Sequence, residues 1–159
     1  MTGKQASKWL FLALLIGLLF VLDVVAMHAV FTSQRSGSND FYPRWRGAQL
    51  FYLEGADPYS EEVTLEIQRG IRGRPSRPDE DQLAFAYPFY TSLLLLPLLW
   101  LSYDWVEAIW LVAVQFSLIA GVIMYLQALR WRPPPVTLAG TILWAVIVYH
   151  GARTILLGQ

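Results

Sequence analysis

Long apolar runs separated by polar connections set the pattern of the chain. The runs cover residues 8–31, 83–101, 105–129 and 136–157. Each approaches the ~20 residues that an α-helix needs to cross a bilayer, and none alternates like a half-buried strand. The pattern therefore predicts an all-α fold, a polytopic transmembrane helical bundle with about four spans. Pro97 interrupts the second run, so that span is expected to be kinked or short.

The polar connection at residues 32–82 is too long for a turn and is expected to form the first external loop. Asn39 or Asp40 can cap a short helix here, because apolar residues recur at helical spacing through Trp45 and Tyr52. Aromatic rings prefer the boundary between lipid and water. The helix is therefore expected to lie along the membrane interface.

A turn and a charged segment complete this connection. Four residues are predicted to form the turn that ends the short helix, namely Gly55, Asp57, Pro58 and Tyr59. Glycine commonly ends helices and Asp-Pro sequences start turns. A short amphipathic piece follows from Val63 to Ile71. Residues 72–81, with the sequence RGRPSRPDED, are charged and broken by prolines, so they are expected to be mobile.

The composition agrees with a lipid environment. Hydrophobic residues make up 55% of the chain and charged residues 15%, against about 25% in typical soluble proteins. The mean hydropathy is +0.41. The formal net charge is zero, which argues against nucleic acid as a partner, because binding to phosphate backbones requires a basic excess. The absence of cysteine excludes disulfides and thiolate chemistry.

The two ends of the chain carry separate expectations. Lys4 and Lys8 precede a first apolar run that is long enough to be a retained span rather than a cleaved signal peptide. These lysines favour a cytoplasmic amino terminus. The opposite topology, with the amino terminus outside, is favoured by the arginines of the first loop and by Arg130 and Arg132. Charge therefore leaves the topology open. At the other end, Gln159 follows an apolar segment directly, which predicts a portion of a longer protein.

Carboxylate and arginine chemistry is what the sequence offers for function. His28 and His150 lack the spacing of a zinc site, and no nucleotide or triad motif is present. Asp40 follows the first span closely and could act as a general base, although it could equally be a plain helix cap. Arg44 and Arg46 could bind a phosphate as bidentate donors or could face solvent and lipid headgroups.

The order of short motifs resembles that of the GT-C superfamily of membrane glycosyltransferases. The first matching features are a span followed by Asp40-Phe41-Tyr42, then Trp45 and the Gly55-Ala56-Asp57-Pro58-Tyr59 turn. Further along the chain, Ala86-Tyr87-Pro88 precedes an apolar run that ends in Pro97. The last matching feature is the terminal Leu157-Gly158-Gln159. The pattern most closely resembles the polyprenol-phosphate-mannose-dependent mannosyltransferases of glycosyltransferase family 87. Phe89 departs from it where the family often has a second proline, and such enzymes have many more than four spans.

The resemblance implies a specific activity and location. Such enzymes transfer a sugar, here mannose, from a polyprenyl-phosphate donor to a lipid or glycan acceptor with inversion. Asp40 matches the family's general base. Tyr87 lies in a matching motif, where it could contact substrate or could be purely architectural. The implied location is the bacterial plasma membrane, with the amino terminus in the cytoplasm and the first loop outside. The resemblance implies no cofactor beyond the donor sugar and leaves a divalent metal open.

Two other classes of protein fit the same sequence. A non-catalytic membrane subunit or assembly factor could retain the front of the fold alone. A transporter would explain why Asp23 and His28 fall within an apolar span, since ionisable groups there usually face protein or water. Both side chains could also lie at headgroup level or line a groove for a lipid substrate.

Overall fold

A computed structural model describes residues 3–34 and 40–148, and every regular element within these ranges is a helix. The all-α prediction is therefore confirmed for the described part of the chain. In chain order the elements are α1 (Gly3–Met27), the π-helix η1 (His28–Thr32), α2 (Phe41–Gln49), the π-helix η2 (Leu50–Glu54), α3 (Glu61–Arg72), the 3₁₀-helix η3 (Phe89–Leu98), α4 (Tyr103–Ala128) and α5 (Pro135–Ile147).

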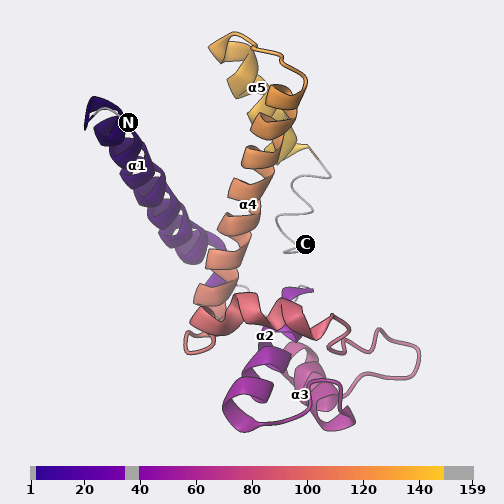
Figure 1. Cartoon of the computed structure of the whole chain (residues 1–159). Coiled ribbons are helices and arrows are strands. Elements are labelled where there is room, and N and C mark those ends of the chain that lie inside the picture. Colours follow the sequence, from indigo (N-terminus) through magenta and orange to yellow (C-terminus); the bar gives the residue numbers. More distant parts are fainter. Residues whose placement is uncertain (1–2, 35–39, 149–159) are drawn as a thin grey trace.

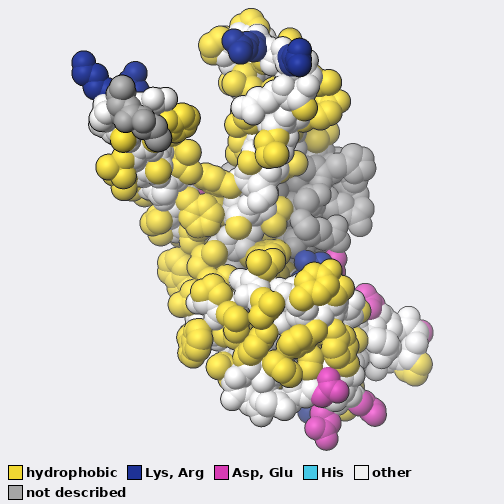
Figure 2. Space-filling view, in the orientation of Figure 1, with side chains coloured by type: hydrophobic (Ala, Val, Ile, Leu, Met, Phe, Trp, Pro, Cys, Tyr) yellow, Lys and Arg dark blue, Asp and Glu magenta, His cyan; other side chains and the backbone are white. Residues whose placement is uncertain are grey.

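Two helices in the described ranges are long and apolar enough to cross a membrane. They are the continuous helix of 30 residues at Gly3–Thr32 and the helix of 26 residues at Tyr103–Ala128. At 1.5 Å per residue both exceed the ~30 Å hydrocarbon core of a bilayer. The predicted helices at residues 8–31 and 105–129 are confirmed. Most of α1 exposes apolar side chains, and Figure 2 shows them along both helices.

The two long helices meet near the end of α1 and diverge toward its beginning, as Figure 1 shows. Val24 of α1 is buried against Ala108 and Val112 of α4. One turn earlier, the ring of Phe20 meets that of Phe116 edge to face, with centroids 5.4 Å apart. Apolar contact therefore joins the helices over a limited stretch next to the first loop.

The structure contradicts the prediction that residues 83–101 form a span. Residues 83–88 are not helical, and the 3₁₀-helix η3 that follows has ten residues. A 3₁₀-helix rises about 2.0 Å per residue, so η3 is about 20 Å long and too short for the ~30 Å hydrocarbon core. Pro97 lies inside it and supplies no amide hydrogen. In Figure 1, η3 crosses the foot of α4 instead of running beside it.

The predicted span at residues 136–157 is also shorter in the structure. The helix α5 starts at Pro135 and ends at Ile147, which gives it 13 residues. Proline suits the first position of a helix because the first amide hydrogens have no intrahelical acceptor. The remainder of the predicted span, from residue 149, lies outside the described residues, as does the Leu157-Gly158-Gln159 motif.

The short helix of the first loop forms and ends as predicted. It starts at Phe41 and continues through the π-helix η2 to Glu54. Gly55 then takes a left-handed conformation, with φ at 73°, which a residue without a side chain adopts at little cost. Asp40 precedes the first turn, but its side chain makes no capping hydrogen bond. The interpretation of Asp40 as a plain cap is therefore not supported.

The core of this region contradicts the interfacial position predicted for Trp45. Its side chain is buried, and its ring lies 5.1 Å from that of Tyr103 at the start of α4. Phe41, one turn earlier, is fully buried and stacks on Trp110 of α4 with centroids 4.7 Å apart. Leu95 of η3 belongs to the same cluster. The helix α2 is therefore packed between η3 and α4.

The charged segment after α3 is tied down by hydrogen bonds, against the prediction that it is mobile. Arg74 donates two hydrogen bonds to the two carboxylate oxygens of Glu80, at 2.8 and 2.6 Å. The backbone N–H of Arg77 donates a third at 2.9 Å. The Arg74 guanidinium and this N–H hold the pKa of Glu80 at about 2, well below its ordinary value of 4.5.

The order of this segment is expected to depend on pH. Because the folded pKa of Glu80 is lowered, its carboxylate stabilises the segment fully above about pH 4.5, and this is lost as the pH falls toward 2. Amide hydrogen exchange of residues 74–83 should be slower in the wild type than in Glu80→Gln near pH 5, and the difference should close toward pH 2. Glu62→Gln, on exposed Glu62, should match the wild type throughout. A difference in exchange rate between the wild type and Glu80→Gln that stays constant with pH would contradict the assignment of this order to the Glu80 carboxylate.

Candidate functional site

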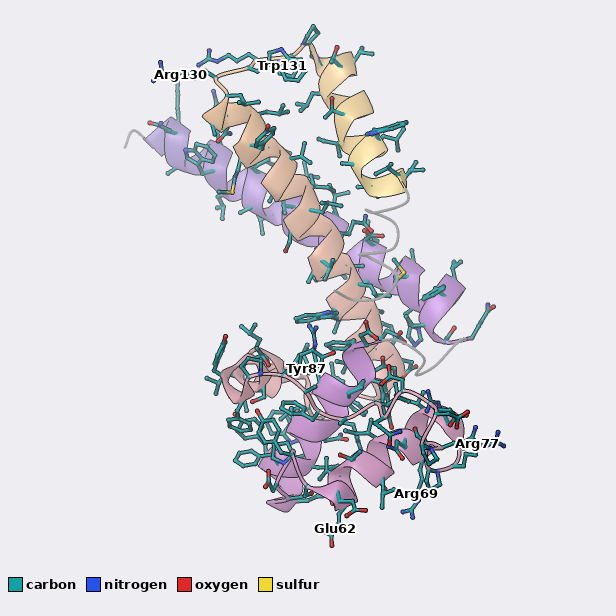
Figure 3. The ribbon with its side chains drawn as sticks, turned by 90° about the vertical axis from the view of Figure 1, so that its right-hand side faces the viewer. Glu62, Arg69, Arg77, Tyr87, Arg130 and Trp131 are labelled. Carbon is teal, nitrogen blue, oxygen red and sulfur yellow. The ribbon has the colours of Figure 1, made fainter. Side chains whose placement is uncertain are left out.

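Three of the residues that the sequence singles out lie together beside α2. Asp40 and Arg44 are four positions apart, so they share one face at the start of the helix. Tyr87 comes from the connection before η3. Figure 3 shows Tyr87 beside α2, at the end of the molecule where α4 begins. Segments separated by more than 40 residues in sequence therefore meet here.

Tyr87 links to both of the other residues. Its phenolic O–H donates to the backbone carbonyl of Asp40 at 3.2 Å. The guanidinium carbon of Arg44 lies 3.9 Å from the centroid of its ring, a cation–π arrangement. Among the described residues, the buried Nε–H of Arg44 has no hydrogen-bond acceptor.

The predicted turn supports Tyr87 from the other side. The Asp57 side chain accepts a hydrogen bond from the backbone N–H of Tyr59 at 3.0 Å, an Asx turn of the kind expected before Pro58. The phenolic O–H of Tyr59 donates to the backbone carbonyl of Tyr87 at 2.6 Å. The turn predicted at Gly55–Tyr59 is thus confirmed, and it positions the candidate site through Tyr59.

Arg46 has a different environment from Arg44. Its guanidinium donates to Glu66 of α3 at 2.9 Å and to the Gln49 side chain at 2.5 Å. The bond to Glu66 links α2 to α3, and the bond to Gln49 lies within α2, so the structure does not bring Arg46 together with Asp40 and Tyr87. Tyr42, between the two helices, is half-buried, and burial raises its pKa above 10.0 despite the nearby Arg46. Tyr42 therefore stays protonated at neutral pH.

A second polar group joins the two long helices. His28 Nε2 lies 2.8 Å from Asp104 Oδ2, within hydrogen-bonding distance, and its ring stacks on Trp105 with centroids 3.7 Å apart. Closer to the middle of the helices, Gln115 donates to Asp23 at 3.0 Å. The sequence points to Asp23 and His28, but it gives no signal for their partners on α4. These bonds explain both side chains structurally, so they give no support to the transporter hypothesis.

The carboxylates and histidines of the described ranges form no group of three that could hold a metal ion. What the cluster of Asp40, Arg44 and Tyr87 offers is a carboxylate at the surface and a cation on the same helix face. A carboxylate can accept a proton from a hydroxyl, and a guanidinium edge can bind an anionic oxygen. The contact of Tyr87 with Asp40 is made to the main-chain carbonyl, so it fixes the backbone of Asp40 at this site.

Comparison of the chain with protein-family models, with curated proteins and with solved structures gives no match. The class that the fold itself defines is a helical protein with two helices that could cross a membrane. Any narrower assignment therefore depends on the site.

Removing the Tyr87 hydroxyl is expected to destabilise the site modestly. Tyr87→Phe loses the bond to the Asp40 carbonyl but keeps the ring beneath Arg44, and it should reduce the free energy of unfolding by about 1 kcal/mol. Tyr87→Leu also removes the cation–π contact and should cost about 0.5–1 kcal/mol more. Unfolding of the full chain in detergent micelles measures both, and equal values for the two variants would argue against the Arg44 contact.

Proposed function

We propose that the chain is part of a membrane glycosyltransferase of the GT-C type, with Asp40 as its general base. The observation that carries the proposal is the meeting of Asp40, Arg44 and Tyr87 at the foot of the two long helices. The short motifs whose order resembles the family come from separate parts of the sequence. Their convergence at one site is what a shared catalytic role requires.

In the proposed reaction the Asp40 carboxylate takes the proton of an acceptor hydroxyl. The oxygen then forms a bond to the anomeric carbon of the sugar while the bond from that carbon to the donor phosphate breaks. Polyprenyl phosphate leaves with the bonding electrons, and the anomeric configuration inverts. Mannose is the sugar we propose, and a lipid or glycan is the acceptor.

Of the two arginines, Arg44 is the better candidate for the donor phosphate. No ion pair within the described residues engages its guanidinium edge, and the guanidinium carbon lies 3.9 Å from the centroid of the Tyr87 ring. Arg46 is already engaged by Glu66 and Gln49. Guanidinium groups bind phosphate oxygens through such an edge with two parallel hydrogen bonds.

We also propose that α1 and α4 cross the bacterial plasma membrane with the first loop outside. Figure 2 shows Lys and Arg side chains at two tips opposite the first loop, one at the start of α1 and one where α4 turns toward α5. The basic residues of these two segments are Lys4, Lys8, Arg130 and Arg132. Short connections rich in lysine and arginine favour the cytoplasm, but the first loop carries seven arginines, so the resemblance to the GT-C enzymes supports this orientation more than charge does. This arrangement puts α2, α3 and the candidate site on the external face, where the polyprenyl-phosphate sugar donor is expected.

The orientation can be tested with single cysteines in this cysteine-free chain. Ser102→Cys, at an exposed position before α4, should react with a membrane-impermeant maleimide added to intact cells. Ser7→Cys, exposed near Lys4 and Lys8, should react only after the cells are opened. The reverse pattern would place the candidate site in the cytoplasm and overturn the proposed topology.

The activity itself is tested with the full-length protein in lipid vesicles. Polyprenyl-phosphate-linked mannose carrying a radioactive label is supplied with a membrane lipid extract as acceptor. Label should move to a lipid or glycan product, with the anomeric configuration opposite to that of the donor. A product with retained configuration would contradict the single-displacement mechanism, and the absence of transfer from polyprenyl-phosphate sugars would contradict the function.

A further inference from the structure

Among the described residues, the charged side chains at the end of the molecule opposite the first loop are all basic. The sequence contains no Asp or Glu before Asp23 and none after Glu107. Lys4, Lys8, Arg130 and Arg132 therefore have no acidic neighbours in sequence. The ion pairs in the described part of the chain involve other residues. The charge at this end is available to an anion from outside the chain.

Arg130 stands in a conformation that disfavours a side chain. It ends α4 with φ at 53°, in the left-handed region where glycine is usual. The N–H of Trp131 then donates to the carbonyl of Leu126 at 3.0 Å and closes the helix end. A residue other than glycine is uncommon at such a position. Figure 3 shows Arg130 and Trp131 at the tip where α4 turns toward α5.

An apolar groove lies directly below this tip, between α4 and α5. Its volume is about 530 Å³, and its lining includes Gly121, Tyr125 and Trp131. Besides Tyr125, two residues with aliphatic hydroxyls line it, and each of these two hydroxyls bonds within its own helix. Ser117 donates to the carbonyl of Ala113 at 2.7 Å, and Thr141 donates to that of Thr137 at 2.8 Å. The groove therefore offers hydrocarbon and aromatic surface rather than polar recognition.

We propose that this groove and the adjacent arginines form a binding site for an acidic glycerophospholipid. The lipid phosphate would bind Arg130 and Arg132, and one acyl chain would lie in the groove beside Gly121. Basic pockets between membrane helices bind acidic headgroups, and guanidinium groups bind phosphate oxygens in pairs. The proposal requires that α4 crosses a membrane, but it does not depend on sugar transfer.

The position of the site separates this lipid from the proposed sugar donor. The arginines lie at the end of α4 that is remote from Asp40, so a phosphate bound there cannot take part in chemistry at Asp40. A polyprenyl phosphate acting as donor would be needed on the other side of the bilayer. We therefore assign the site to a resident phospholipid of the membrane leaflet that faces the basic end.

The number of lipid molecules bound to the full chain, and their affinity, can be measured by native mass spectrometry from detergent micelles. Phosphatidylglycerol and phosphatidylcholine with identical acyl chains are added in parallel, and phosphatidylglycerol should bind more tightly. Changing both arginines, Arg130→Gln with Arg132→Gln, should weaken it by about fivefold for each charge removed. The matched control, Lys4→Gln with Lys8→Gln, removes the same charge from the same end and should leave the affinity unchanged.

A second pair of variants tests the groove separately from the charge. A side chain added at Gly121 meets open space, so Gly121→Leu fills the groove without a clash and should weaken phosphatidylglycerol binding. Gly17→Leu makes the same change on α1, where the space is also open, and should have no effect.

Four results would overturn the proposal. They are equal binding of the two phospholipids, equal loss in the lysine and arginine variants, unchanged binding in Gly121→Leu, and tighter binding of undecaprenyl phosphate than of phosphatidylglycerol.

Discussion

Replacing Asp40 with Asn is expected to lower the rate of sugar transfer by about 10²–10⁴-fold, the usual contribution of a general base. The amide has nearly the same shape as the carboxylate but cannot take the proton of the acceptor hydroxyl. The Asp40 side chain makes no capping hydrogen bond, so the change removes no bond of this kind from α2. Initial rates with saturating donor, measured for the full-length protein in vesicles, give the comparison.

The same substitution at Asp57 provides the control for this experiment. Asp57 accepts a hydrogen bond from the N–H of Tyr59, and an Asn side chain retains the oxygen that accepts it. Asp57→Asn should therefore transfer sugar at close to the wild-type rate. Turnover by Asp40→Asn that equals that of Asp57→Asn would rule out Asp40 as the base and would leave the fold assignment untouched.

Replacing Phe41 with Ala is expected to have the largest effect on stability, a loss of about 3–5 kcal/mol in the free energy of unfolding. Phe41 is fully buried and stacks on Trp110, so truncation leaves a cavity where α2 packs on α4. Thermal unfolding in detergent micelles, followed by loss of helical signal, measures the change. Because Phe41 follows Asp40 directly, the variant should also lose sugar transfer.

An exposed aromatic residue in the same region shows whether the loss reflects burial. Tyr90 of η3 is 71% exposed, so Tyr90→Ala should change the free energy of unfolding by no more than about 0.5 kcal/mol. Similar losses for the two variants would mean that Phe41 does not anchor α2 in the folded protein.

The parts of the fold that sequence could predict are those determined locally. The long apolar runs define α1 and α4, and the helix that ends at Gly55 follows from apolar spacing and a glycine stop. The run at residues 83–101 was wrongly predicted as a span because its composition alone is apolar enough. Two features decide the conformation of this run, namely Pro97 and the packing of Leu95 against α2. The proline can be read from the sequence, but the packing cannot.

The candidate site shows the same division. Asp40 and Tyr87 could be proposed from short motifs, and Arg44 from the chemistry of its guanidinium. The contact with Tyr87 that separates Arg44 from Arg46 depends on which loop passes beside α2. The partner of Arg46, Glu66, lies 20 positions further along and one helix away. Asp104 likewise meets His28 across 76 positions. Such long-range pairs result from tertiary packing, for which a single sequence has no local signal.

The π-helix at the end of the first span has a consequence for insertions and deletions. In η1 the N–H of Ser33 bonds to the carbonyl of His28, five positions back, so the turn accommodates one residue more than an α-helix would. Deletion of a single residue within His28–Thr32 could therefore be absorbed by a return to α-helical pitch, with the flanking segments kept in register. The same deletion in the α-helical part of this helix, at Leu19 for example, would instead rotate the segments on its two sides relative to one another by about 100°.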